Sequence, residues 1–270
     1  MLNSVKSVAL VNDMCGLGRC SLTVAIPIIS ALGIQPVPVP TALLSCHTAY
    51  PAYYFKDFSP YFSDYINSLN SQKQKIDAIY TGFMGSEAEL DIITEFVKNN
   101  DLFTFVDPVM GDHGKAYSTY NNIMCDKMKH LVALSDVTTP NITEACLLSD
   151  THYKENFTDD ELIIIAKAVC ELGAKVCIIT GIVRNDKIHT LVYKDNGEHF
   201  ININDRTEIM YDGTGDIFAS VLCGKLLGGD DLEISVKSAC DFVSQATQFT
   251  TKLGTPPLDG IVFEPLLHDL

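Results

Sequence analysis

Short apolar, β-branched runs alternate along the chain with longer segments of helical periodicity, and this alternation restricts the fold more than any other property of the sequence. The strand-like runs cover residues 7–11, 34–39, 78–83, 102–106, 136–139 and 176–180. The helical patterns cover residues 19–32, 57–69, 86–99, 120–134, 159–172, 214–227 and 232–253. Because strands this apolar need cover on both faces, the alternation predicts an α/β fold in which helices sandwich a mostly parallel central sheet.

Two further strand-like runs predict an antiparallel edge for this sheet. Residues 190–193 and 200–203 flank Asp195-Asn196-Gly197, which is typical of a hairpin turn. The proline-dotted residues 35–40 are compatible with a linker, but a short extended segment at a sheet edge is the favoured interpretation. Since no repeat, low-complexity tract or long Gly/Ser/Pro-rich linker occurs, we expect one domain over residues 1–270.

Composition excludes several classes of partner. The 270 residues carry a net charge of −15, which repels nucleic acid and anionic membranes, so neither is expected as a partner. An anionic ligand would have to be bound locally, by oriented backbone amides and a metal ion. No apolar run is long enough to span a bilayer, no secretory signal is visible, and nine cysteines occur without a C-x-x-C pair. We therefore expect a cytoplasmic protein in a reducing compartment, without a zinc site.

The strongest local motif is Tyr211-Asp-Gly-Thr-Gly-Asp216, directly before a predicted helix. Its two glycines allow a tight turn that exposes consecutive N–H groups at the helix start, where the helix dipole favours an anion. Asp216, in the first helical turn, could accept a proton from a substrate hydroxyl group. In the alternative interpretation Asp212 is only an N-cap, and Asp216 only complements the helix dipole.

Two more motifs follow predicted strands. Asp107-Pro-Val-Met-Gly-Asp112 places two carboxylates five positions apart, which suits Mg²⁺, although such residues also form ordinary solvated turns. In Thr138-Thr-Pro-Asn-Ile-Thr-Glu144, Pro140 and Asn141 open a helix with Glu144 in its first turn; the alternative is a capping motif without further function. Parallel sheets bind ligands beyond the carboxyl ends of their strands, so both motifs lie where a ligand is expected.

A fourth motif runs from Asn12 to Ser21 and again joins a strand to a helix through glycines. Its Gly16-Leu-Gly18 comes close to the dinucleotide-binding fingerprint. However, residues 35–40, where a ribose-binding acid is expected, contain no acid. This weakens a dehydrogenase interpretation. The sequence also lacks G-x-x-x-x-G-K-[ST], which argues against a P-loop nucleotide site.

Taken in order, these elements resemble the ribokinase-like superfamily over nearly the whole chain. Asp107 to Asp112, Thr139-Pro-Asn141 with Glu144, and Ser45-Cys-His-Thr48 resemble the pyridoxal kinases more than the sugar kinases. The resemblance implies the superfamily's three-layer sandwich, with helices on both faces of a mostly parallel sheet and an antiparallel edge. It also implies a homodimer.

The resemblance assigns roles to particular residues. It implies that Asp216 is the catalytic base and that Gly213, Thr214 and Gly215 form the anion hole. It assigns ATP phosphates and cations to Asp107, Asp112, Thr139, Asn141 and Glu144, with Mg²⁺ near Asp112 and Glu144, and a phosphate contact to Thr180. It further assigns the pyridine ring of a substrate to Asp13, Thr48 and Phe83.

The function implied by the resemblance is ATP-dependent phosphorylation of the 5′-hydroxymethyl group of a vitamin B6 vitamer, with ATP and Mg²⁺ required and K⁺ a candidate accessory ion. Asp13 stands where several relatives have serine, and Phe83 where they have tyrosine. Asp216 stands where hydroxymethylpyrimidine kinases usually have cysteine, which favours a B6 kinase. Two alternatives stay open: a kinase for hydroxymethylpyrimidine or another small hydroxymethyl or sugar substrate, and a ligand-sensing module without turnover.

Overall fold

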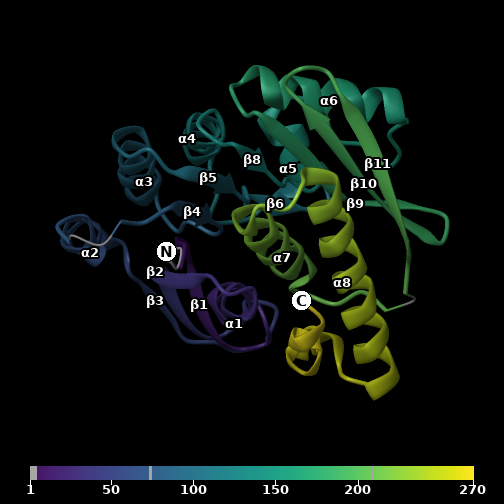
Figure 1. The fold of residues 1–270 in the computed structure, drawn as a ribbon, viewed down its shortest axis with the longest axis horizontal. Coiled ribbons are helices and arrows are strands. Elements are labelled where there is room, and N and C mark those ends of the chain that lie inside the picture. Colours follow the sequence, from purple (N-terminus) through teal and green to yellow (C-terminus); the bar gives the residue numbers. More distant parts are fainter. Residues whose placement is uncertain (1–4, 73–74, 208) are drawn as a thin grey trace. The chain divides into compact units, whose positions relative to one another are not determined.

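The computed structural model describes residues 5–72, 75–207 and 209–270. Its internal contacts group the chain into two compact units. Unit 1 comprises Met1–Tyr80 and Asn204–Leu270, and unit 2 comprises Thr81–Ile203 (Figure 1). The two units are described separately below.

Unit 1 contains both ends of the described chain. Its elements are β1 (Ser7–Leu17), α1 (Leu22–Ala31), β2 (Gln35–Cys46), β3 (Phe55–Asp57), α2 (Ser59–Asn70), most of β4 (Ala78–Thr81), α7 (Thr214–Gly228), α8 (Leu232–Leu253), and the 3₁₀ helices η1 (Pro257–Asp259) and η2 (Glu264–Asp269). The strands lie in the order β4-β1-β2-β3. Large side chains buried in this unit include Leu10, Leu22, Ile28, Phe62 and Phe263.

Strand β2 is longer than the sequence predicted. The expected strand at residues 34–39 continues to Cys46 and pairs in parallel with β1, with Ser7 opposite Gln35. The Gln35 N–H donates to the Lys6 carbonyl oxygen at 2.9 Å, so the prolines at positions 36, 38 and 40 direct their missing N–H groups away from β1. Only residues 42–44 of β2 pair with β3 on the other side. The proline-dotted segment is therefore strand and not a linker.

The helix that carries the predicted anion-hole motif is buried on nearly all sides. The buried residues of α7 are Ile217, Phe218, Ala219, Ser220, Val221, Leu222, Cys223, Gly224 and Leu227. Helix α1 contacts β1, β2 and α7, and α7 in turn contacts α8 (Figure 1). A Cβ atom on Gly224 would lie 2.3 Å from Leu32 Cδ1, so the Leu32 side chain packs closely against the α7 backbone at this point. The buried residues begin at Ile217, directly after the first turn, whose residues 214–216 are half-buried or exposed.

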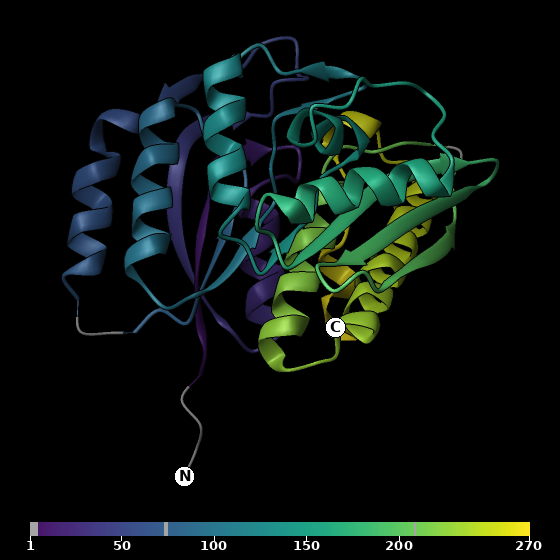
Figure 2. The same ribbon diagram turned by 90° about the horizontal axis from the view of Figure 1, so that it is seen from above.

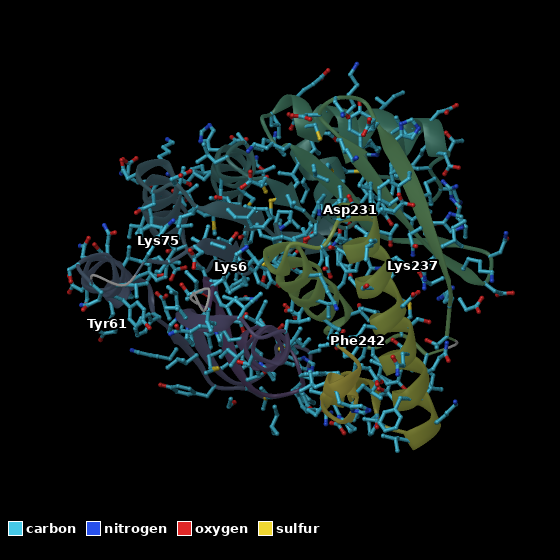
Figure 3. All side chains as sticks on the ribbon, in the orientation of Figure 1. Lys6, Tyr61, Lys75, Asp231, Lys237 and Phe242 are labelled. Atoms are coloured by element: carbon cyan, nitrogen blue, oxygen red, sulfur yellow. The ribbon has the colours of Figure 1, made fainter. Side chains whose placement is uncertain are left out.

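Helix α8 shows the one-sided pattern that its periodicity predicts, and it has the predicted bounds of residues 232–253. Phe242 is buried, whereas the Lys237 side chain is exposed and pairs with Asp241 one turn further along the helix (Figure 3). Asp231 caps the helix by accepting the Glu233 N–H, and Gly254 ends it in a left-handed conformation.

Unit 2 holds the second group of strands and helices. Its elements are α3 (Glu87–Asn99), β5 (Phe103–Val106), β6 (Gly111–Asp112), β7 (Lys115–Ala116), α4 (Asn122–Val132), β8 (Val137–Thr138), α5 (Ile142–Leu148), α6 (Asp159–Glu171), β9 (Val176–Arg184), β10 (Lys187–Lys194) and most of β11 (His199–Asp205). The main strands lie in the order β11-β10-β9-β8-β5, and β6 and β7 form a separate small hairpin. Large side chains buried in this unit include Met84, Leu90, Ile93, Phe105 and Met110.

The antiparallel edge is confirmed and is more extensive than predicted. Strands β10 and β11 are joined by the Asp195-Asn196-Gly197 turn, closed by the Lys194 N–H donating to Glu198 O at 2.9 Å. Strand β9 continues past residue 180 to Arg184 and pairs antiparallel with β10, a hairpin that the sequence analysis did not predict. Helix α6 packs along β9 and β10 (Figure 2).

The strand pairs confirm the predicted fold class. β1–β2, β5–β8 and β8–β9 are parallel, whereas β2–β3 and β9–β10 are antiparallel and lie toward the ends of the strand orders. The chain thus has a mostly parallel central sheet with an antiparallel edge and surrounding helices, an α/β fold.

Candidate active site

The start of helix α7 is open in the way that an anion site requires. Gly213 is the N-cap, with φ of 82° in the left-handed region, and no side chain caps the helix. Asp212 is exposed and is not the N-cap, so the capping interpretation of this aspartate is wrong. The N–H groups of Thr214 and Gly215 belong to the first turn, where an α-helix offers no acceptor of its own. They are therefore available to a ligand.

Gly213 is also required by its surroundings. A Cβ atom at this position would lie 2.3 Å from the carbonyl oxygen of Arg19. The Arg19 side chain is held by the C-terminal segment of the same unit: Nε donates to Glu264 Oε1 at 2.6 Å, and Nη1 donates to Asp259 O at 3.0 Å. The turn before α1 and the start of α7 are therefore in close backbone contact.

Asp216 lies in the first turn of α7 and is half-buried. Burial of its carboxyl group raises the pKa from 3.8 to about 6, and the nearby charge of Asp13 adds to the rise. Hydrogen bonds from the Ser21 N–H and the Asn12 side chain oppose that rise. A carboxyl group with a pKa near 6 is well matched to accept a proton near neutral pH.

Asp13 is the second carboxylate of this cluster and lies in β1. It is 8% exposed, and its Oδ1 accepts the Ser21 hydroxyl at 2.6 Å. Burial raises its pKa, while the Ser21 hydrogen bond acts in the opposite direction. Unit 1 thus brings together the predicted base Asp216 and the predicted ring contact Asp13.

Asn12 and Ser21 belong to this cluster, but the sequence analysis did not name them as site residues. The sequence offered one indication of their importance, because Asn12 and Ser21 are the first and last residues of the motif that joins a strand to a helix. The contacts themselves could not be anticipated, because Ser21 has φ of 56°, which is uncommon for any residue other than glycine.

The glycines of the same motif have a packing explanation. A Cβ atom on Gly16 would lie 2.6 Å from Ser45 O on β2, and Gly18, with φ of 94°, lies directly against the His47 ring. The segment where a ribose-binding acid would be expected is the proline-containing half of β2. The near match to a dinucleotide fingerprint therefore reflects close backbone packing.

Unit 2 holds the second group of predicted residues, arranged around the start of α5. Asn141 is the N-cap: its Oδ1 accepts the Glu144 N–H at 3.0 Å, and Glu144 Oε2 accepts the Asn141 N–H at 2.8 Å. Glu144 Oε1 also accepts the Met110 N–H at 3.1 Å, and Asn141 Nδ2 donates to Gly111 O at 2.8 Å. The predicted capping motif is present, and it also binds the loop that follows β5.

Glu144 is 4% exposed, and burial raises its pKa well above its ordinary value, with the nearby Asp107 carboxylate as the next cause. Asp107, itself 8% exposed, accepts the Thr139 hydroxyl at 3.1 Å. Unit 2 therefore brings Asp107, Thr139, Asn141 and Glu144 together. Two buried carboxylates of like charge are costly unless a proton or a cation offsets them.

The remaining predicted residues lie at different places. Asp112 is exposed in the β6–β7 hairpin and accepts the His113 N–H at 2.7 Å. Thr180 lies in β9, where its N–H donates to Pro140 O at 3.0 Å beside Asn141. Thr48 is exposed just after β2 in unit 1, and Phe83 is half-buried just after β4 in unit 2.

Two general features bear on possible ligands. In the part of the chain that the structure describes, no group of three or more His, Cys, Asp or Glu residues is arranged to hold a metal ion. Within the same residues, none of the helices combines the length and the hydropathy that crossing a membrane requires.

Known proteins of similar sequence and fold show which family this chain belongs to. The family model for phosphomethylpyrimidine kinase matches residues 26–258. A Bacteroides thetaiotaomicron crystal structure assigned as a phosphomethylpyrimidine kinase is similar at 36% identity with a TM-score of 0.95, over 100% of this chain and 95% of that one. A second crystal form with the same description contains pyridoxal, and it matches at 36% identity with a TM-score of 0.93.

Curated relatives fall into the same class. A pyridoxine/pyridoxal/pyridoxamine kinase from Bordetella avium is 26% identical over 86% of this chain and 81% of its own length. A hydroxymethylpyrimidine/phosphomethylpyrimidine kinase from Haemophilus influenzae is 28% identical over 64% of this chain and 65% of its own length. Fold and site together define a small-molecule kinase of the ribokinase-like superfamily. Within it, the chain belongs to the pyridoxal and phosphomethylpyrimidine kinase family.

Proposed function

We propose that this kinase transfers the γ-phosphoryl group of ATP to the 5′-hydroxymethyl group of a vitamin B6 vitamer: pyridoxal, pyridoxine or pyridoxamine. The observation that carries the proposal is the Asp216 carboxyl group, with a pKa raised to about 6, at the uncapped start of α7. The similarity to a structure that contains pyridoxal supports the choice of acceptor.

In this proposal Asp216 accepts the proton of the acceptor's hydroxyl group as the oxygen attacks phosphorus. The backbone from Gly213 to Gly215 and the positive end of the α7 dipole stabilise the negative charge on the transferring phosphoryl group. The helix is buried over residues 217–224, so the first turn that carries these groups is continuous with a packed helix. Positioning and electrostatics then supply most of the rate enhancement.

The unit 2 residues are assigned to the nucleotide. Asp107, Thr139, Asn141 and Thr180 are proposed to contact ATP phosphates, directly or through bound cations. Asp112 and Glu144 are proposed to hold Mg²⁺, which in such sites neutralises phosphate charge and takes few protein ligands besides the phosphates. The buried pair of Asp107 and Glu144 fits a nearby cation, because burial and then the Asp107 charge raise the pKa of Glu144. Their oxygen atoms are also the ligand type that Mg²⁺ prefers.

The acceptor ring is assigned to Asp13, Thr48 and Phe83. Asp13 is the best supported of the three, because its buried carboxyl group lies beside Asp216. An aromatic side chain such as Phe83 suits a flat heterocycle.

Hydroxymethylpyrimidine is the second candidate acceptor. The Haemophilus influenzae relative carries that activity in its description, and the matching family model is described as phosphomethylpyrimidine kinase. Both acceptors are nitrogen heterocycles that carry a hydroxymethyl group, so a pocket need not separate them strongly.

A panel of acceptors tests the proposal. The purified chain is incubated with MgATP and each of pyridoxal, pyridoxine, pyridoxamine, hydroxymethylpyrimidine and ribose, while ADP release and product mass are recorded. We expect at least one B6 vitamer to give the highest kcat/KM and a product heavier by one phosphoryl group. Turnover of hydroxymethylpyrimidine alone would favour the second candidate, and tight binding without ADP release would identify a ligand-sensing module.

The same proposal has residues 1–270 acting as one kinase domain in a cytoplasmic homodimer, with K⁺ as an accessory ion. The support is the family resemblance. Sedimentation velocity of the purified chain tests the dimer, and replacing K⁺ with Na⁺ in the kinase assay tests the ion requirement.

A further inference from the structure

Asp216 and three neighbouring residues, Asn12, Asp13 and Ser21, form a ring of hydrogen bonds. The Asp216 carboxylate accepts the Ser21 N–H and the Asn12 side-chain amide. The Ser21 hydroxyl donates to Asp13 Oδ1 at 2.6 Å, and the Asp13 N–H donates to Asn12 Oδ1 at 2.9 Å. The ring joins β1, the start of α1 and the first turn of α7, all within unit 1.

Two backbone irregularities make this ring possible. The pairing of β1 with β2 shifts register between Asn12 and Met14, where β2 carries the extra residue and Asp13 lies opposite it. Bulges of this kind redirect a side chain and are frequent next to active sites. Ser21 is the N-cap of α1 with φ of 56° and ψ of −135°, which is a strained conformation for a residue that has a Cβ atom. Ser21 belongs to the ring, and strain of this kind persists only where the surroundings require it.

We propose that Asn12 and Ser21 are positioning residues that hold the Asp216 carboxyl group for proton transfer, and that the Ser21 hydroxyl fixes Asp13 so that its charge acts on Asp216. This inference rests on the proposed kinase function. It gives Asp13 a role in addition to contact with the heterocycle of the acceptor. It also adds Asn12 and Ser21 to the residues of the candidate active site.

The groups that connect Asp13 with Asp216 show whether Asp13 acts through its charge or by passing on a proton. Ser21 reaches Asp216 through its backbone N–H and reaches Asp13 through its hydroxyl group. An amide N–H does not release its proton at neutral pH, so no chain of exchangeable protons joins the two carboxyl groups. Asp13 therefore acts on Asp216 through its charge.

The groups that face Asp216 come from each neighbouring segment. Asn12, Asp13 and the Cys15 thiol come from β1, and the Cys20 thiol and Ser21 come from the turn before α1. The Arg19 side chain is engaged by Glu264 and by the Asp259 carbonyl oxygen. Asp13 raises the pKa of Asp216, whereas the Asn12 and Ser21 hydrogen bonds lower it.

These opposite signs give a test that a purely structural role would fail. The dependence of kcat/KM on pH is measured for the wild-type chain, Asp13→Asn and Asn12→Leu, which nearly preserve side-chain volume. We expect a wild-type acid limb with a midpoint near 6. Asp13→Asn should move that midpoint down by roughly one unit, and Asn12→Leu should move it up by a similar amount. Midpoints that stay in place, or that move in the same direction in both variants, would overturn the inference.

Ser21→Gly provides a second route to the same result if Asp13→Asn does not fold. Glycine accepts φ of 56° without strain and keeps the N–H that binds Asp216, but it lacks the hydroxyl group that stabilises the Asp13 charge. The midpoint should again move down. Thr23→Val is the matched control, because the Thr23 hydroxyl binds only the Cys20 carbonyl oxygen in the same turn; its profile should overlay that of the wild type.

Direct titration separates this inference from the proposed function. The carboxyl ¹³C signal of Asp216, assigned by its loss in Asp216→Asn, is followed against pH in the same variants without substrate. Opposite shifts of its midpoint in Asp13→Asn and Asn12→Leu support the ring even if no acceptor is phosphorylated, in which case only the proposed function fails. An unchanged Asp216 midpoint in both variants refutes the ring's effect on basicity whatever the kinase activity.

Discussion

At Asp216, the requirement for an effective base opposes the requirement for a stable fold. Its buried carboxyl group has a pKa raised to about 6, which makes it a usable base, but burial of the charged form opposes folding. The pKa is higher in the folded chain than the ordinary 3.8, so the folded state binds the proton more tightly than the unfolded state does. The stabilisation by this proton is complete below about pH 4 and is lost as the pH rises through about 6.

Asp216→Asn should therefore raise thermal stability at neutral pH. Asparagine has no charge to bury, so we expect Tm at pH 7.5 to exceed the wild-type value. The gain should be at most about 1 kcal/mol, because solvent screens a half-buried group. The difference should vanish near pH 4, where the aspartate is protonated. Calorimetry at both pH values measures it, with Asp212→Asn, just before α7, as an exposed control. A variant less stable than wild type at pH 7.5 would contradict the assigned burial cost.

The start of α7 depends on a glycine at one position. Gly213→Ala would place a Cβ atom 2.3 Å from Arg19 O on a backbone with φ of 82°. We expect a loss of about 2 to 3 kcal/mol in the free energy of unfolding, because strain and a backbone clash both contribute. Activity should fall with it, since the N–H groups that follow would be displaced.

Gly228→Ala is the matched control at the other end of the same helix. A Cβ atom there meets nothing within 4 Å, and its φ is not positive. This variant should gain about 0.5 to 1 kcal/mol in the free energy of unfolding and keep its activity. Urea denaturation of both variants with a kinase assay provides the comparison. Equal effects at the two positions would show that the α7 start is not specially constrained.

Two helices begin with the same capping box, and only one of the two is proposed to bind a cation. Glu144 caps α5 in the buried cluster with Asp107, whereas Glu161 caps α6 at the surface with Thr158. Glu144→Gln should raise the Mg²⁺ concentration for half-maximal activity by about tenfold, because it removes a carboxylate charge. Glu161→Gln should leave that concentration unchanged. Mg²⁺ titrations at fixed ATP measure it, and equal behaviour of the two variants would limit Glu144 to a capping role.

Over the molecule as a whole, hydrophobic periodicity correctly predicted those helices and strands in which neighbouring residues alone determine the structure. Helix α8 has the predicted bounds, and the β10–β11 hairpin forms around the predicted turn. The errors occur where pairing partners decide the structure. Strand β2 runs on to Cys46 because β1 pairs with it, and β9 runs on to Arg184 because β10 folds back onto it. Neither partner is visible from the local pattern.

In the candidate site, too, some residues were predictable from the local sequence and others depend on contacts between distant segments. Asp216 and the glycines before it were predictable, because helix-start chemistry lies within six consecutive residues. Glu144 and Asn141 were predictable for the same reason. The ring through Asn12 and Ser21 was not, since it joins segments about 200 positions apart and needs a strained serine backbone. A sequence motif shows which residues are adjacent in the chain. It does not show which residues from distant segments donate hydrogen bonds to the same carboxyl group.

Single-turnover phosphoryl transfer by Asp216→Asn, measured with saturating MgATP and the best acceptor of the panel, tests the role of this carboxylate. Asparagine keeps the shape of the side chain but cannot accept the hydroxyl proton. We predict a rate constant lower by about 10² to 10⁴, with the KM for ATP changed by less than about threefold. A rate within about twofold of the wild type, in a variant shown to be folded, would contradict the assignment of Asp216 as the base.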